Sequence, residues 1–258
     1  MLGEHMKLVT IVKLQWLLTW RSPDQLIGVV VLPLSTIIAG AIIDSNGRAD
    51  LLYYSLVAIS LMTIIQTGFM TAAELMVNDR VSGVLESMIV TTSSYLTILA
   101  VRVLIVTAVG MLGCSISWLI LVVSFDVILV PYHPWVALIT LIATTLATAW
   151  ASFFLAALIC RARSARAVQN SLAAPVFLLA GVLVPVGFLS PWLELPGRVL
   201  YVFWAAELLR DSFIASEPRD VVLRLYMLFT TGFMWAILGI VLLRRMLSRL
   251  RRDGALHG

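Results

Sequence analysis

Residues 135–159 read WVALITLIATTLATAWASFFLAALI, a run of 25 residues without a charged side chain. At a helical rise of about 1.5 Å per residue, this run is long enough to cross the roughly 30 Å hydrocarbon core of a bilayer. Ala143, Ala147 and Ala151 recur at four-residue spacing, which places small side chains on one helix face. Because small residues let helices approach closely, we expect this face to pack against a neighbouring helix.

Five further runs have similar length and composition, at residues 25–43, 51–73, 103–123, 167–188 and 221–243. The chain as a whole is 61% hydrophobic and only 12% charged, whereas soluble domains carry about 25% charged residues. The sequence therefore predicts an all-α membrane protein with six transmembrane helices, forming a single transmembrane domain over residues 1–258.

Residues 4–20 precede the first run and form a separate segment. Ser22 and Pro23 supply a helix start signal, with the serine as N-cap and the proline at the first helical position. Trp16 and Trp20 stand near basic residues at the end of this segment, which is typical of a helix lying in the membrane interface. We therefore expect an interfacial helix, although its apolar residues fall nearly all round it. No small-residue cleavage site follows the segment, so we expect no signal peptide.

The distribution of lysine and arginine indicates the orientation. With the N-terminus in the cytoplasm, thirteen of the 18 basic residues fall in cytoplasmic segments and five fall outside. Lysine and arginine accumulate in cytoplasmic loops, so the pattern predicts a protein of the cytoplasmic (inner) membrane with both termini inside. The basic excess then reflects topology and not a nucleic-acid partner. At residues 244–252 it is expected to attract anionic lipid headgroups, and contact with an ATPase subunit is the alternative.

Two connections are too long to be simple turns. Residues 79–92 lie in a cytoplasmic connection and have the apolar spacing of a short helix. Residues 187–220 are external yet rich in apolar and aromatic side chains. A fully solvated loop does not have this composition, so we expect re-entrant helices that dip back among the spans before the sixth one.

The motifs that are missing narrow the function. The sequence has no phosphate-binding loop, no zinc-protease motif and no serine-hydrolase elbow, and its three histidines and two cysteines are isolated. We read the histidines as surface residues and Cys114 and Cys160 as small hydrophobes.

Almost no ionisable residue lies within the spans, and Glu74 and Arg102 stand at cytoplasmic ends where long side chains reach water. Energy must therefore come from another chain, and the candidate pathway residues are uncharged: Gln66, Thr67, Asn170 and Ser171.

Residues 79–92 read DRVSGVLESMIVTT. This stretch resembles the cytoplasmic segment of ABC-2 type exporter permeases, whose pattern is approximately E-R-E-x-G-T-L-E-x-L-L-x-T-P. Val81, Val84 and Thr92 depart from the pattern. The positions that match it, or carry a similar residue, are Asp79, Arg80, Gly83, Leu85, Glu86, Met88, Ile89 and Thr91.

A second stretch resembles the same family. Residues 179–185 (LAGVLVP) and 189–193 (LSPWL) are similar to its fifth span and external re-entrant helices. AAELLR at residues 205–210 is similar to the E-A-L-R sequence that ends this region in the family. The Asn-Pro pair usually found shortly before is replaced by Leu200 and Tyr201, which leaves the shape of the re-entrant turn open.

The resemblance implies a permease subunit of an ATP-driven exporter. In such proteins the segment corresponding to 79–92 is a coupling helix that docks on a separate ABC ATPase, which binds ATP and Mg²⁺; this chain then needs no cofactor and is not itself an enzyme. A second permease copy or a homologue completes a dimer. Within the family, the chain resembles drug- and antibiotic-exporter permeases, such as the daunorubicin-exporter type. We therefore expect efflux of an amphipathic or hydrophobic drug, antibiotic, peptide or lipid-linked molecule.

Aromatic residues of the external segment suggest a gate. Trp192, Phe203 and Trp204, with Glu207 beside them, are candidates for an apolar plug that closes the pathway on the outer side. An interfacial aromatic belt explains the same residues equally simply. Two other classes also remain open for the whole chain: a self-contained channel or secondary transporter, and a membrane scaffold or immunity protein that transports nothing.

Overall fold

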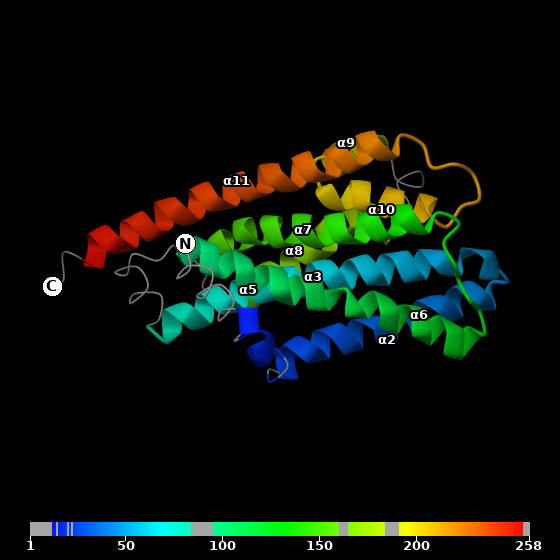
Figure 1. Ribbon diagram of the computed structural model, residues 1–258, viewed down its shortest axis with the longest axis horizontal. Helices are drawn as coiled ribbons and strands as arrows, with labels where there is room; N and C mark the ends of the chain where they lie inside the picture. Colours follow the sequence, from blue (N-terminus) through cyan, green and yellow to red (C-terminus); the bar gives the residue numbers. More distant parts are fainter. Residues whose placement is uncertain are drawn as a thin grey trace.

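The structure, a computed structural model, describes residues 12–13, 15–19, 21, 23–83, 95–159, 165–183 and 191–254. Every secondary-structure element in these ranges is a helix (Figure 1), which confirms the all-α prediction. The elements are α2 (Pro23–Ser45), the short 3-10 helix η1 (Ala49–Leu51), α3 (Leu52–Val81), α5 (Tyr95–Gly110), α6 (Leu112–Phe125), α7 (Pro134–Ile159), α8 (Ala165–Leu179), α9 (Pro191–Arg198), α10 (Tyr201–Asp211) and α11 (Val221–Gly254).

Five stretches of the described residues are long and apolar enough to cross a membrane: Gly28–Ser45, Leu52–Asp79, Tyr95–Phe125, Pro134–Leu158 and Val221–Met246. They correspond to the first, second, third, fourth and sixth predicted spans. α3 is the central helix, because 80% of its most apolar stretch is buried, compared with 22% for α2 and for α11. The chain is therefore a multi-pass helical membrane protein built around α3.

The predicted third span consists of two helices that meet at Met111. Glycines on both sides of this break bring it close to α3. A Cβ atom on Gly110 would come within 3.2 Å of both Ile64 Cα and Thr67 Cβ, and one on Gly113 would overlap Thr63. The missing side chains thus let the α5–α6 pair lie against the central helix.

The predicted fifth span ends earlier than expected. α8 has 15 residues, about 22 Å of helix, which is shorter than the hydrocarbon core. Gly181 has a φ of +66° and lies in a Schellman motif, in which Val182 N donates to Phe177 O and Gly181 N to Leu178 O, both at 3.0 Å. A helix continuing to Phe188 is therefore wrong. Residues 184–190 lie outside the described ranges, so a membrane crossing by the fifth predicted span stays a prediction.

The predicted packing face of the fourth span is confirmed. Ala143, Ala147 and Ala151 are 1%, 0% and 5% exposed and belong to the main core. A Cβ atom on Gly232 of α11 would approach Ala147 Cβ to 2.8 Å. Small residues on both helices thus bring α7 and α11 together.

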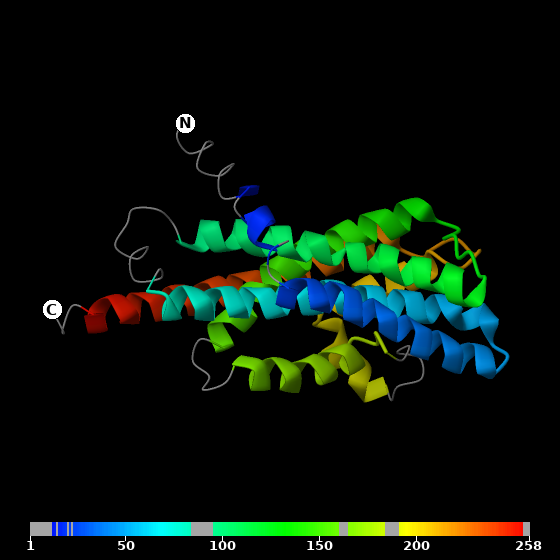
Figure 2. The ribbon, with the colours of Figure 1, turned by 90° about the horizontal axis from the view of Figure 1, so that it is seen from below.

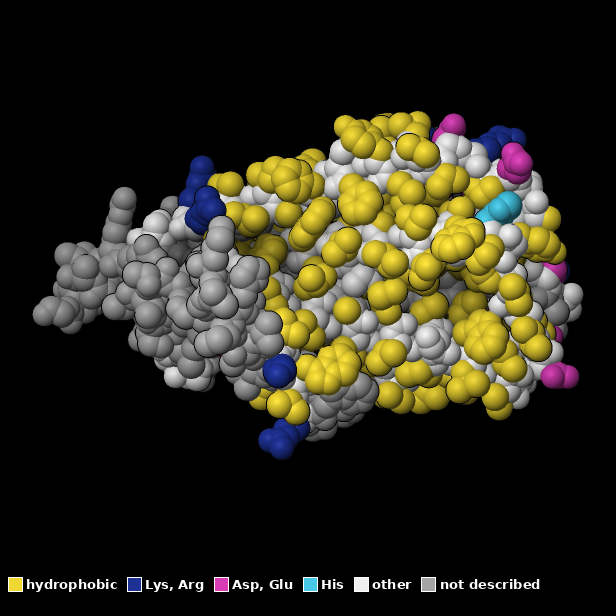
Figure 3. Space-filling model, in the orientation of Figure 1, with side chains coloured by type: hydrophobic (Ala, Val, Ile, Leu, Met, Phe, Trp, Pro, Cys, Tyr) yellow, Lys and Arg dark blue, Asp and Glu magenta, His cyan; other side chains and the backbone are white. Residues whose placement is uncertain are grey.

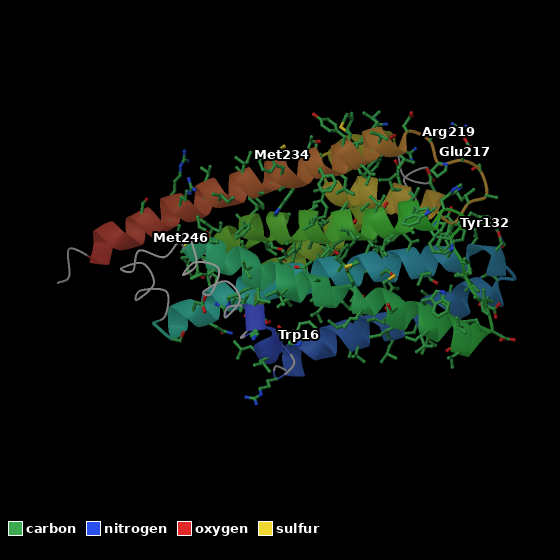
Figure 4. The ribbon with its side chains drawn as sticks, viewed as in Figure 1. Trp16, Tyr132, Glu217, Arg219, Met234 and Met246 are labelled. Carbon is green, nitrogen blue, oxygen red and sulfur yellow. The ribbon has the colours of Figure 1, made fainter. Side chains whose placement is uncertain are left out.

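The two ends of the bundle differ in charge. We call the end where α3 finishes and α5 begins the Asp79 end, and the opposite one the α10 end. On the face shown in Figure 3, most Lys and Arg side chains lie towards the Asp79 end, and the carboxylates lie at the α10 end beside a further basic side chain. Hydrophobic side chains cover the surface between the two ends. In Figure 4, Glu217 and Arg219 project from the segment beyond α10, whereas Met234 on α11 points outward into the apolar zone. This distribution is that of a protein crossing a bilayer.

Candidate functional site

A buried polar cluster at the Asp79 end brackets the predicted coupling segment. Arg102 Nη1 donates to Asp79 Oδ2 at 2.9 Å and to Oδ1 at 3.0 Å. The Tyr95 hydroxyl donates to Asp79 Oδ2 at 3.1 Å, and Arg102 Nε donates to Gln15 Oε1 at 3.0 Å. We call these four residues the Asp79 cluster.

The Asp79 cluster joins three separate parts of the chain. Asp79 lies in the last turn of α3, Tyr95 and Arg102 belong to α5, and Gln15 lies in the helical residues before α2. Asp79 is only 6% exposed, and a buried charge is tolerated when it is paired and hydrogen-bonded. The cluster therefore fixes both ends of the connection at residues 80–94 and attaches the N-terminal segment to them.

Two expectations change in this region. Arg102 does not extend into water as expected from its place at a helix end; its guanidinium is paired inside the protein. The helical residues within 12–21 bury polar Gln15 and Thr19, at 2% and 0% exposure, and expose Trp16 at 48%. The protein-facing side is thus the polar one, which explains the apolar residues elsewhere on this helix: they face outward.

The other predicted coupling residues are only partly described. Arg80 lies in the last turn of α3, and Gly83 follows in the turn with a φ of +71°, a conformation that favours glycine. Leu85, Glu86, Met88 and Ile89 lie outside the described residues.

The predicted pathway residues do not meet in one described contact. Thr67 on α3 is 7% exposed and donates to Thr63 O at 2.6 Å, so its hydroxyl is used within its own helix. Gln66 is half-buried, and Ser171 is exposed on α8. The side chain of Asn170 is not described. α8 lies on the flank of the bundle (Figure 2) and has α3 and α7 among its neighbours.

The predicted gate residues lie in different environments at the α10 end. Phe203 is 2% exposed and part of the main core, whereas Trp192 on α9 is 70% exposed. Trp204 packs edge-on against Phe203, with ring centroids 5.1 Å apart, and its Nε1 donates to Arg198 O at 3.0 Å. Phe203 and Trp204 thus secure the corner between α9 and α10, and Trp192 is the exposed aromatic residue of the three.

Glu207 belongs to a group of charges between α10 and α11. Arg224 Nη1 binds Asp211 Oδ2 at 2.6 Å, and Arg224 Nε lies 4.0 Å from Glu207 Oε2. Burial raises the pKa of Glu207 above its ordinary value, and the positive charge of Arg224 partly offsets the rise. These contacts attach α10 to the start of α11.

Arg210 is a structural residue that the sequence analysis placed outside and passed over. It is 6% exposed, and its Nη2 donates to the carbonyls of Gly181 and Val182, the latter at 2.9 Å. Its guanidinium carbon lies 5.5 Å from the ring centroid of Tyr54, within cation–π range. Arg210 therefore binds the carbonyl groups where α8 breaks. Its place at the end of the family-like stretch AAELLR was the available sequence signal.

The residues that the structure describes thus form an all-helical bundle, with the Asp79 cluster at one end and the short helices α9 and α10 towards the other. The family model for the ABC-2 type transporter matches residues 6–214. The chain belongs to this family and is a permease subunit of an ABC transporter. No curated protein matches the chain.

Proposed function

We propose that this chain is the permease of an ATP-driven exporter and works with a separate ABC ATPase that binds ATP and Mg²⁺. The observation that carries the proposal is the Asp79 cluster, which fixes both ends of the connection containing the family-like segment 79–92. A connection fixed at both ends transmits a push from a partner to α3 and α5 instead of absorbing it. Asp79, buried at 6% exposure, holds the segment, and Arg80, Gly83, Leu85, Glu86, Met88 and Ile89 contact the ATPase.

Glu86 is the residue of choice for a test. We expect Glu86→Lys to abolish export and to weaken ATPase binding, because reversing a charge at an interface places like charges together. Export from vesicles and retention of the ATPase on the tagged permease are measured together. Ser87→Lys is the control, since it introduces the same lysine at a position that the family pattern leaves unspecified. Unchanged export and unchanged ATPase retention in Glu86→Lys would sink the coupling role.

The same proposal includes the orientation and the assembly. Most basic side chains on the face shown in Figure 3 lie towards the Asp79 end. This supports an inner-membrane protein with this end and both termini in the cytoplasm. α8 is shorter than a span and exposes Ser171 on the flank of the bundle, and serine is among the small residues enriched where helices pack in membranes. This favours a second permease copy or a homologue along the α8 flank, with the pathway between the two and Gln66, Thr67, Asn170 and Ser171 near it.

The α10 end is then external, and Trp192, Phe203, Trp204 and Glu207 belong to its gate region. Phe203 and Trp204 support the corner between α9 and α10, and Trp192 is the side chain free to contact a substrate or the membrane interface. A Trp192→Ala variant distinguishes the gate from an interfacial belt. A gate predicts increased ion leak or altered export of a hydrophobic or amphipathic substrate such as a drug, antibiotic, peptide or lipid-linked molecule; unchanged leak and export favour the belt.

A further inference from the structure

A cavity of about 420 Å³ lies among α3, α6, α7 and α10 near the α10 end. Its floor includes Leu56 and Val57 of α3 and Leu209 of α10, which are 4%, 0% and 3% exposed. Ser115 and Trp118 of α6 lie at its more exposed rim. None of the described residues lining it is charged.

The cavity is covered on its α10 side. Trp118 Nε1 donates to Leu129 O at 2.8 Å, which attaches the segment between α6 and α7 to α6. His133 N donates to Ser212 O at 3.0 Å, and His133 Nε2 lies 3.2 Å from Ser216 O. The His133 ring is therefore bonded to the neighbouring segment. The two connecting segments together form a roof.

The cavity opens sideways, between α6 and α7. α6 and α7 separate towards the α10 end in both ribbon views (Figures 1 and 2), and Ser115 and Trp118 are exposed there. The neighbouring surface of α7 is apolar, with Ile139 and Ile142 both 46% exposed. An opening between these helices faces the hydrocarbon of the bilayer.

The chemistry of the walls selects the occupant. The volume is within the usual range of ligand sites. The lining is mostly apolar, with Ser60, Cys114 and Ser115 as its polar side chains on α3 and α6, so it offers water few hydrogen-bond partners. Left empty, its lining loses dispersion contacts. Tyr132 and Trp135, 67% and 74% exposed, stand at the beginning of α7 as aromatic residues do at a membrane interface. The opening beside Ala137, less than a helical turn below Trp135, therefore lies at the level of the upper acyl chains.

We propose that this cavity binds one acyl chain of a membrane lipid from the adjacent leaflet, which enters sideways between α6 and α7. The chain packs on Leu56, Val57 and Leu209 and leaves its headgroup at the level of Tyr132 and Trp135. Its test requires neither transport nor the ATPase.

The test uses the full chain in lipid nanodiscs that contain phosphatidylcholine with a photoreactive diazirine near the end of one acyl chain. After illumination, mass spectrometry maps the labelled residues. We expect labelling of Leu56, Val57 or Leu209, which ordinary lipid contact cannot reach because these residues are buried. Exposed Ile139 and Ile142 serve as markers of ordinary lipid contact.

Two variants close the cavity in different ways. Ser115→Trp obstructs the rim at an exposed position, and Ala137→Leu fills the wall; both should lose floor labelling and keep labelling of Ile142. Ile139→Trp, on the exposed surface of α7, is the control and should keep floor labelling. Absence of floor labelling in the unaltered chain, or its persistence in both cavity variants, would overturn the proposal. Floor labelling by a free alkyl diazirine but not by the phospholipid would also overturn it, in favour of a small apolar ligand.

Discussion

At the scale of single residues, Arg210 has an unusual position for a charged side chain. It is buried between α10, the end of α8 and Tyr54, and its two hydrogen bonds go to backbone carbonyls instead of to a carboxylate. A helix that stops inside a membrane protein leaves carbonyl groups in need of donors. Arg210 supplies them, so the broken end of α8 is stable at this place.

Replacing Arg210 by alanine should destabilise the permease and reduce export. Each hydrogen bond to a charged group contributes about 1.5–3 kcal/mol, and the variant leaves the Gly181 and Val182 carbonyls without this donor. Arg210→Lys keeps the charge but not the planar group, so we expect an intermediate loss. Thermal unfolding in mild detergent measures both. Arg198→Ala is the control, because Arg198 is 55% exposed in a surface pair with Glu194; equal unfolding midpoints for Arg210→Ala and Arg198→Ala would contradict the role of Arg210.

The importance of some of these residues was predictable from the sequence, and that of others was not. Asp79 was selected from its family-like segment, and the structure adds that its partner Arg102 lies 23 positions further along the chain. That pairing depends on how α3 and α5 pack, which residue patterns do not report. Arg210 was assigned to the outside because an arginine in an external segment usually meets water, and its burial follows from the insertion of α10 into the bundle.

At the scale of elements, the Asp79 cluster connects α3, α5 and the N-terminal helical residues. A pair of this kind is costly to break, because removal of one partner leaves a buried charge alone. It is therefore suited to keep the ends of the 80–94 connection at a fixed distance while a partner acts on the segment between them.

Exchanging the two charges tests this function. Asp79→Arg alone should lower the free energy of unfolding by about 3–5 kcal/mol and stop export, because two positive charges then face each other. The double variant Asp79→Arg with Arg102→Asp restores the opposite charges and should recover part of both properties. Unfolding midpoints and export rates are compared across the single and double variants. If the double variant were no better than the single one, a direct pairing of these side chains would be refuted.

The elements were predictable where length and polarity determine them. Five of the six predicted spans coincide with candidate membrane-crossing stretches, because about 20 apolar residues in a bilayer leave helix as the solution. α8 was overextended, since the apolar residues after Gly181 continue the pattern although this glycine ends the helix. The side of the N-terminal helix that faces the protein was not predictable either: buried Gln15 and Thr19 reverse the rule that applies in water.

At the scale of the whole molecule, the described charges lie at the two ends and the apolar surface lies between them (Figure 3). This arrangement follows from composition and from the placement of lysine and arginine, and it required no knowledge of packing. The partners of the chain depend on surfaces that composition does not specify. The central claim, that an ATPase in a separate chain powers this permease, therefore needs a direct measurement.

That measurement is affinity purification of the tagged chain from its native membrane in mild detergent, followed by mass spectrometry with quantification. The account predicts that an ABC ATPase is recovered at about one copy per copy of this chain, with a second permease where the dimer is mixed. Recovery of the chain without any ATPase in several detergents would contradict the account and leave a self-contained channel, a secondary transporter or a non-transporting scaffold or immunity protein as its replacement.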